Sequence, residues 1–244
     1  MRKSEHSQAE GCQRIEAWLD KHPEAFLTFS GGKDSTVVLH MLKQVQDNPK
    51  IAFFDTGLLY HQTYSFMKQI QRRWNVQIAS ITTDPPPLDV IEASGIWEHG
   101  VDKFNFDMKK LLIDNYLEAA HEHFDTPYSI YGLRAEESAG RKYALTPGKG
   151  VVSKGYKDGK HTESMSPIWD WSSQDINAYI IEHKVPLNSA YKKLRELGVP
   201  SNKRRTGVAL SDGIHIGDWA LNYEVDPSLG KLLESRLPLL RDFR

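Results

Sequence analysis

The chain has 244 residues, 39% of them hydrophobic and 26% charged, which is enough for one large domain or for one domain with an appendage. Its 31 Lys and Arg against 32 Asp and Glu give a net charge of -1, which excludes nucleic-acid binding through overall charge but not through a local patch. The single cysteine, Cys12, excludes intramolecular disulfides and sites built from several thiolates of one chain. Since no apolar run suits a membrane span or a signal peptide, we expect a cytoplasmic protein without a membrane partner.

Short apolar runs alternate with helical patterns along most of the chain, which predicts an α/β fold with an open parallel sheet. Strands are expected at residues 25–29, 51–54, 76–81 and 128–131. Helices are expected at residues 8–19, 37–45, 63–74, 108–117 and 172–185. We predict a nucleotide-binding α/β domain over residues 1–190 and a less regular C-terminal appendage over residues 191–244, packed on the same domain.

The segment between residues 146 and 163 carries four glycines, four lysines and little apolar content. Such a composition indicates a mobile surface loop or a short hairpin, and makes the segment a candidate lid.

The most informative segment lies between the first strand and the next helix and reads Ser30-Gly31-Gly32-Lys33-Asp34-Ser35. Its glycines allow a tight turn and close approach of a ligand, and the N–H groups that open the helix face outward. A lysine and two serine hydroxyls add a charge and further donors, so the segment predicts a phosphate site. It lacks the GxxxxGK[ST] spacing of the kinase P-loop. The alternative, a glycine turn with a helix cap, would need neither the lysine nor both serines.

This hexapeptide is identical to the signature of the PP-loop ATP pyrophosphatases, and the sequence resembles that family. The resemblance implies a Rossmann-like fold of the adenine nucleotide alpha-hydrolase type, with ATP bound by its phosphates at the loop. It also implies cleavage between the α and β phosphates, adenylation of an acceptor and release of pyrophosphate.

Three further segments are similar to the branch that contains phosphoadenylyl-sulfate (PAPS) reductase and the small subunit of sulfate adenylyltransferase. The first is Asp55-Thr56-Gly57 followed by Thr63-Tyr64-Ser65-Phe66, with Gln62 in place of the usual acid. Asp55 ends the second predicted strand, where open α/β sheets bind their ligands. A helix-capping role for Asp55 is the alternative.

The second segment runs from Tyr131 through Gly132 and Arg134 to Ser138, with Arg141 beyond it. Its glycine permits close backbone approach, and its arginines supply planar forks for phosphate or another anion. The arginines could instead pair with Glu136 and Glu137 in a structural network.

A third similar segment, residues 166–191, is rich in Trp, Tyr and Pro. Core packing is the simpler interpretation of its Trp171, Ile176 and Tyr179.

The resemblance to the reductases breaks at the cysteine, because they carry a nucleophilic thiol near the C-terminus and this chain ends LPLLRDFR. Cys12 lies in a helical stretch before the first strand, which favours an ordinary helix residue. We therefore expect an enzyme of the ATP pyrophosphatase or adenylyltransferase type, and not a reductase.

The resemblance implies Lys33 and Arg134 as catalytic residues that stabilise charge on the α phosphate, with ATP and Mg²⁺ as cofactors and Asp34 and Asp55 as metal ligands. The residues expected to bind the nucleotide are Ser30, Gly31, Gly32, Lys33, Asp34, Ser35, Asp55, Thr56, Gly57, Gly132, Arg134, Ser138 and Arg141.

The partner is expected to be a small-molecule nucleotide, with an unidentified acceptor such as sulfate, a flavin mononucleotide or a nucleobase carbonyl. Sulfate would imply a regulatory GTPase partner by family analogy. A homodimer is compatible with the sequence. The six basic residues within 192–205 could hold a polyanion or nucleic acid, or could form a solvated helix face followed by a loop.

Two other functions stay open at this point. The chain could sense ATP or PAPS without catalysis, or it could reduce PAPS with a non-standard thiol.

Overall fold

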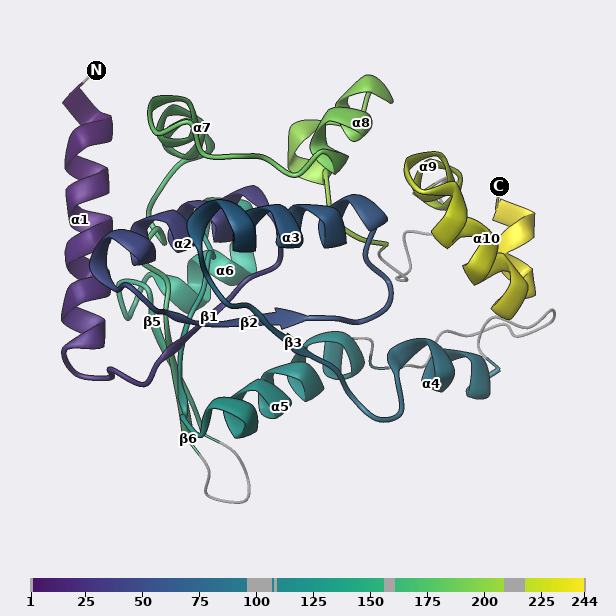
Figure 1. The fold of residues 1–244 in the computed structure, drawn as a ribbon, viewed down its shortest axis with the longest axis horizontal. Coiled ribbons are helices and arrows are strands. Elements are labelled where there is room, and N and C mark those ends of the chain that lie inside the picture. The colour runs from purple at the N-terminus through teal and green to yellow at the C-terminus, as the bar shows by residue number, and fades with distance from the viewer. Residues whose placement is uncertain (1, 96–106, 108, 156–160, 209–217, 244) are drawn as a thin grey trace. The chain divides into compact units, whose positions relative to one another are not determined.

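The computed structural model describes residues 2–95, 107, 109–155, 161–208 and 218–243 (Figure 1). Its helices are α1 (Arg2–Leu19), α2 (Lys33–Val45), α3 (His61–Trp74), α4 (Pro87–Ala93), α5 (Asn115–Phe124), α6 (Ala139–Leu145), α7 (Ser173–Glu182), α8 (Ala190–Glu196), α9 (Asp218–Val225) and α10 (Pro227–Arg236). Its strands are β1 (Phe26–Thr28), β2 (Lys50–Phe54), β3 (Ala79–Ile81), β4 (Tyr128–Ile130), β5 (Val151–Gly155) and β6 (His161–Met165). A π-helical turn (Lys110–Asp114) precedes α5, and 3-10 turns lie at Ala135–Glu137, Ser201–Lys203 and Pro238–Phe243.

The strands form one six-stranded sheet in the order β3-β2-β1-β4-β6-β5. β1 is parallel to β2 and to β4, and β4 is parallel to β6. The predicted open parallel α/β fold is therefore confirmed. Because parallel neighbours end at the same edge, the turns after β1 and β4 leave the sheet on one side.

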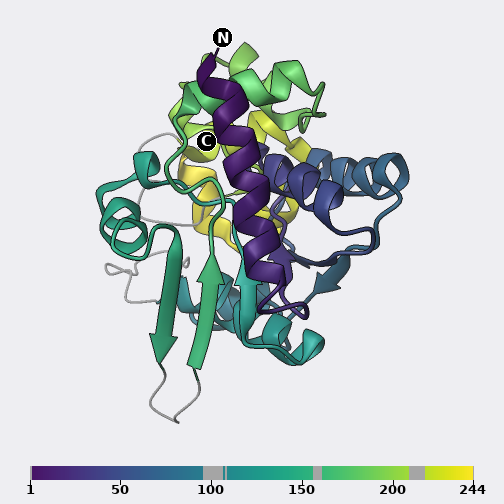
Figure 2. The same cartoon turned by 90° about the vertical axis from the view of Figure 1, so that its left-hand side faces the viewer.

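The outer strand β5 runs antiparallel to β6 (Figure 2). Both strands come from the glycine- and lysine-rich region, so the hairpin is confirmed for its described residues, and the lid stays a prediction. Sequence analysis missed β6 as a sheet strand because its residues, HTESM, are mostly polar.

The chain divides into two compact units, each made of several chain segments. The first comprises Met1–Phe53, Ile70–Ser80 and Ala120–Leu187, and the second comprises Phe54–Gln69, Ile81–Ala119 and Asn188–Arg244. The boundary at residue 190 stays a prediction, and the structure groups the C-terminal segment with two earlier ones.

The core of the first unit forms where the sheet meets its helices. Phe26 and Leu27 on β1, Val37 and Val38 on α2 and Ile130 on β4 are fully buried. Helices α1, α2 and α7 pack against one another. Helix α7 begins with the predicted capping box, in which Ser172 and Asp175 bond reciprocally.

The aromatic segment around α7 supplies core residues to this first unit. Trp171, Ile176 and Tyr179 are each at most 3% exposed, which confirms the core-packing interpretation.

The second unit has its own core, in which Trp219 is fully buried and Tyr60, Leu194 and Leu233 pack around it. The expectation of a less regular C-terminal appendage is wrong for the described residues, because α8, α9 and α10 form there. Two signals could have revealed α10. Asp226 caps it ahead of Pro227, and leucines recur at helical spacing at residues 229, 233, 237 and 240. Within the described residues no helix is both long and apolar enough to span a bilayer.

Candidate functional site

The phosphate loop lies in the first unit, between β1 and α2, as the sequence predicts. Gly31 has φ 69°, in the left-handed region that favours glycine, and Gly32 is the N-cap of α2 without a side-chain cap. The Ser30 hydroxyl oxygen accepts the Gly32 N–H at 3.3 Å and lies 3.1 Å from the Ser35 hydroxyl oxygen. Both serine hydroxyls thus brace the loop, and their predicted contacts with phosphate stay a prediction.

Asp34 is the centre of a charge cluster at the start of α2. Its Oδ2 accepts from the Lys33 ammonium at 2.6 Å, and its Oδ1 accepts from Arg134 Nε at 2.7 Å. Each carboxylate oxygen therefore has a cationic partner, and the three side chains carry one positive charge in excess. The carboxylate holds the two cations close together at the helix end where N–H groups also collect positive charge.

Arg134 is 2% exposed, and its guanidinium is bonded on several sides. Besides Asp34, it donates to Glu136 Oε2 at 3.2 Å and to the carbonyl of Trp171 at 3.3 Å. The alternative of a structural ion-pair network is therefore present. These contacts suit Arg134 to position Asp34, whereas its predicted direct role at the α phosphate stays a prediction.

Gly132 follows β4 and packs against the loop itself. A Cβ atom built on it would lie 2.7 Å from the backbone nitrogen of Ser35 and 2.9 Å from the carbonyl carbon of Asp34. Real Cβ atoms do not approach backbone this closely, so only glycine fits without a shift. Sequence analysis expected Gly132 to permit a close backbone approach. In the structure, the backbone that lies close to Gly132 is that of the phosphate loop.

Ser138 and Arg141 belong to the start of α6. The Ser138 hydroxyl caps this helix by accepting the Arg141 N–H at 3.2 Å, and the Arg141 guanidinium is paired with Glu137. These contacts give both residues a structural role, and their predicted contact with a nucleotide stays a prediction.

Asp55, Thr56 and Gly57 form a turn in the second unit, directly after β2. Asp55 Oδ1 accepts from the Tyr64 hydroxyl at 2.6 Å and from the Gly57 N–H at 3.3 Å, and Gly57 has φ 72°. The Tyr116 hydroxyl donates to the carbonyl of Asp55 at 3.1 Å. Asp55 does not cap the next helix, which begins at His61, so that alternative is not observed.

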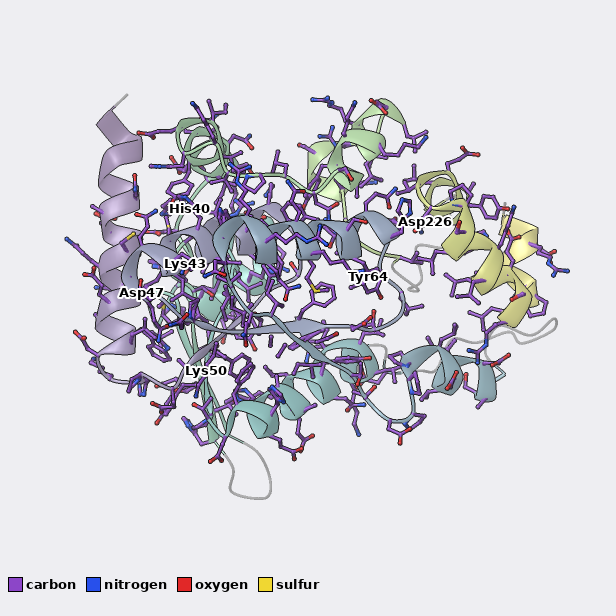
Figure 3. The ribbon with its side chains drawn as sticks, in the orientation of Figure 1. His40, Lys43, Asp47, Lys50, Tyr64 and Asp226 are labelled. Atoms are coloured by element: carbon purple, nitrogen blue, oxygen red, sulfur yellow. The ribbon has the colours of Figure 1, made fainter. Side chains whose placement is uncertain are left out.

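Tyr64 is the residue at this turn to which the sequence analysis gave no role. It lies in the first turn of α3 (Figure 3). Burial, and next the hydrogen bond to Asp55, raise the pKa of Tyr64, so its hydroxyl stays protonated and donates at physiological pH. The sequence alone does not show that Tyr64 donates to Asp55, because the fold brings these two residues together.

The two predicted metal ligands fit Mg²⁺ unequally. Asp34 would have to leave Lys33 or Arg134 to bind a cation. Asp55 accepts from the Tyr64 hydroxyl and the Gly57 N–H, and a carboxylate is the kind of ligand that binds Mg²⁺ together with substrate phosphates. No cluster of three or more His, Cys, Asp or Glu suited to a metal occurs among the described residues.

Cys12 lies on α1 and is partly buried. Burial, and to a smaller extent the charge of Glu16, raise the pKa of its thiol, which disfavours the reactive thiolate.

Comparison with known proteins agrees with these features. Residues 24–219 match the family model described as the phosphoadenosine phosphosulfate reductase domain. The chain belongs to this family. A phosphoadenosine 5′-phosphosulfate reductase of Xanthomonas oryzae is 27% identical over 197 residues, covering 77% of this chain and 76% of that protein. An adenosine 5′-phosphosulfate reductase of Bacillus cereus is 25% identical over 205 residues, covering 81% of this chain and 80% of that protein.

Solved structures show the same fold at lower identity. The PAPS reductase of Candida auris in its phosphate complex has a TM-score of 0.55 at 19% identity, covering 82% of this chain and 93% of that one. The FMN adenylyltransferase of Candida glabrata has a TM-score of 0.55 at 13% identity, covering 78% and 59%. An NH3-dependent NAD synthetase of Campylobacter jejuni has a TM-score of 0.51 at 15% identity, covering 98% and 94%. The family is therefore one of PP-loop nucleotide-binding enzymes.

Proposed function

We propose that this PAPS reductase family member cleaves ATP between the α and β phosphates and adenylates an acceptor. An acceptor oxygen forms a bond to the α phosphorus, the bond from that phosphorus to the bridging oxygen breaks, and pyrophosphate leaves with the bond's electron pair. This step needs phosphate binding and in-line geometry but no protein nucleophile.

The observation that carries the proposal is the charge cluster of Lys33, Asp34 and Arg134 beside the glycine turn. A helix N-terminus and a lysine ammonium collect positive charge in a loop that Gly132 keeps free of a side chain. That combination suits a chain of phosphates better than a single carboxylate or a neutral ligand.

Each residue has a role in this proposal. Lys33, whose side chain is 23% exposed, reaches the phosphates and stabilises the charge of the leaving pyrophosphate. Arg134 acts through Asp34 as a positioning residue. The N–H groups at the start of α2 and the braced Ser30 and Ser35 hydroxyls hold the remaining phosphate oxygens.

Mg²⁺, when bound, would neutralise phosphate charge, and Asp55 is the residue proposed to hold it. Tyr64 and the Gly57 N–H orient the Asp55 carboxylate for this role.

The chemistry of the lone thiol favours adenylation over reduction. The named relatives are PAPS and APS reductases, but Cys12 lies on α1 with a raised pKa, which is the opposite of what a nucleophile needs. The same fold occurs in the FMN adenylyltransferase whose structure contains ATP.

The test is to incubate the protein with Mg-ATP and candidate acceptors and to separate AMP, ADP and pyrophosphate by chromatography. Pyrophosphate is expected in an amount equal to the adenylated acceptor plus any AMP later released from it, and the Cys12→Ser variant should form pyrophosphate at the same rate. Binding of ATP that stays intact with every acceptor would instead favour a sensor. Sulfite formed from PAPS and a thiol donor, and lost in Cys12→Ser, would favour reduction.

A further inference from the structure

Glu136 lies between the start of α7 and Arg134 and hydrogen-bonds to both. Its Oε2 accepts the N–H of Ser173, the first residue of α7, at 2.6 Å. The same oxygen accepts from Nη1 of Arg134 at 3.2 Å. The carbonyl of Trp171, shortly before α7, accepts from this Nη1 at 3.3 Å. Glu136 therefore connects the beginning of α7 to the arginine that holds Asp34.

The contacts continue from Arg134 into the phosphate loop. Nε of Arg134 donates to Oδ1 of Asp34 at 2.7 Å, and the Lys33 ammonium donates to Oδ2 at 2.6 Å. A continuous series of hydrogen bonds thus leads from the Ser173 N–H through Glu136, Arg134 and Asp34 to Lys33. We call this series the α7 link. All of its residues belong to the first unit.

The burial of the two charged partners indicates what Glu136 contributes. The side chain of Arg134 is 3% exposed, whereas that of Glu136 is 50% exposed. A half-exposed ion pair adds little to stability. A guanidinium is planar, however, and its orientation is fixed when Nε and Nη1 both have acceptors. Asp34 supplies the acceptor on Nε, and Glu136 supplies one on Nη1.

We propose that Glu136 is a positioning residue, through which the start of α7 sets the affinity of the phosphate loop for polyphosphate anions. The inference rests on the proposed function, because it takes the loop to be the site of the ATP phosphates. Glu136 holds the plane of Arg134, Arg134 holds Asp34, and Asp34 keeps the Lys33 ammonium at the start of α2.

Charge alone predicts the opposite effect of Glu136. A carboxylate close to an anion site repels the anion, so its removal should strengthen binding if only its charge mattered. If Glu136 positions Arg134, its removal should weaken binding. The sign of the change therefore distinguishes positioning from simple repulsion.

The test is calorimetric titration with inorganic pyrophosphate in the absence of Mg²⁺. Glu136→Ala should weaken binding by about fivefold, the low end for coupling between two sites. Glu136→Gln should bind at least as tightly as the wild type, because its amide oxygen can accept the same two hydrogen bonds. Both variants remove the negative charge, so repulsion alone would strengthen binding in both.

Ser173→Pro breaks the α7 link from its other end. Proline is tolerated at the first position of a helix, and Ser172 before it has φ -81° and ψ 165°, an extended conformation that proline accepts in its neighbour. The variant loses the N–H that donates to Glu136 and should weaken binding by about as much as Glu136→Ala. It also carries the test if Glu136→Ala does not fold. The double variant should bind no more weakly than the weaker single one, because both changes break one link.

The matched control is Asp170→Ala. Asp170 also lies shortly before α7 and pairs with an arginine, but that residue is Arg14 on α1. Its loss should leave the affinity for pyrophosphate unchanged.

Equal or tighter binding by Glu136→Ala, or additive losses in the double variant, would overturn the proposal. If the wild type does not bind pyrophosphate, this proposal and the proposed phosphate site both fail. Pyrophosphate formation from Mg-ATP, measured on the same proteins, separates the two claims. An affinity that depends on the α7 link in a protein that forms no pyrophosphate would overturn only the proposed ATP cleavage.

Discussion

Asp34 and Asp55 are two carboxylates that each follow a strand of one sheet, and the structure gives them different hydrogen-bond donors. Asp34 lies between the ammonium of Lys33 and the guanidinium of Arg134, so each of its carboxylate oxygens accepts from a cationic side chain. Asp55 is held by a tyrosine hydroxyl and a backbone N–H, which are neutral. A carboxylate with two cationic partners organises positive charge for an anion, whereas hydroxyl and N–H donors orient a carboxylate without adding a charge of their own.

The largest effect is expected at Lys33, whose ammonium donates to Asp34 and whose side chain is partly exposed. Lys33→Ala should lower the rate of pyrophosphate formation by about a hundredfold or more, as is typical for loss of one donor to transition-state charge, without changing the unfolding midpoint. Lys43→Ala, at the other end of α2, is the control and should keep full activity. An equal rate in Lys33→Ala would remove Lys33 from the mechanism.

Asp34→Asn tests the ion pairs that Asp34 forms with Lys33 and Arg134. It leaves the buried Arg134 without its main counter-charge, and we expect a loss of about 3 kcal/mol in unfolding free energy, the low end for a broken buried pair because Glu136 remains. Asp170→Asn breaks a more exposed Arg–Asp pair, with Arg14, and should cost below about 1 kcal/mol. Urea unfolding of both variants measures the difference, and similar losses would contradict the distinction drawn here.

Gly132→Ala tests whether the loop depends on its neighbouring strand. The added methyl group would clash with backbone at Ser35, so we expect a loss of about 2 kcal/mol in stability and weaker ATP binding. Gly140→Ala adds the same methyl group on α6, where nothing lies within 4 Å, and should be neutral or slightly stabilising. Calorimetric titration with ATP and thermal unfolding distinguish the two variants.

Tyr64→Phe tests the hydrogen bond that the Tyr64 hydroxyl donates to Asp55. It removes one donor to Asp55, and a hydrogen bond to a charged group contributes ~1.5–3 kcal/mol. We expect the Mg²⁺ concentration for half-maximal pyrophosphate formation to change several-fold, while ATP binding without Mg²⁺ stays the same. A change in metal-free ATP binding of the same size would show that Tyr64 acts on the loop and not on Asp55.

The smallest effect is expected at Asp226, a third carboxylate, which caps α10 and accepts from the His61 N–H at 2.7 Å (Figure 3). Burial opposes its ionisation, but the hydrogen bonds from His61 and Leu229 together outweigh burial and lower the pKa of Asp226. A lowered folded-state pKa stabilises the protein above the unfolded value of about 3.9, and the gain is lost as pH falls below it. Asp226→Asn should therefore lose less stability than the wild type between pH 6 and pH 3, as measured by urea unfolding. Parallel losses would exclude this contribution.

Local patterns in the sequence predicted the parallel sheet and the phosphate loop because their signals are contiguous. Apolar runs bounded by Gly or Pro gave β1, β2 and β4, and Ser172 with Asp175 gave the start of α7. Strand β6 was missed because it is polar. Helix α8 agrees with the alternative of a helix face followed by a loop, whereas α9 and α10 were missed although leucine spacing marked the latter.

The chemistry around the site depended on contacts between distant residues, which a single sequence does not display. The bond from Arg134 to Asp34 spans 100 residues, and that from Tyr64 to Asp55 depends on how α3 leaves its turn. Sequence analysis could name Asp34 and Asp55 as candidate metal ligands, but not which donors each carboxylate accepts from.

The contact between Gly132 and the backbone of Asp34 and Ser35 limits how the loop can be moved to another protein. Six residues copied into a new strand–helix junction would still need a side-chain-free position at the end of the neighbouring strand and an arginine to hold the aspartate. A designer would have to transplant two strands and their following turns together. In this sense the smallest portable unit of the site is a pair of parallel strands.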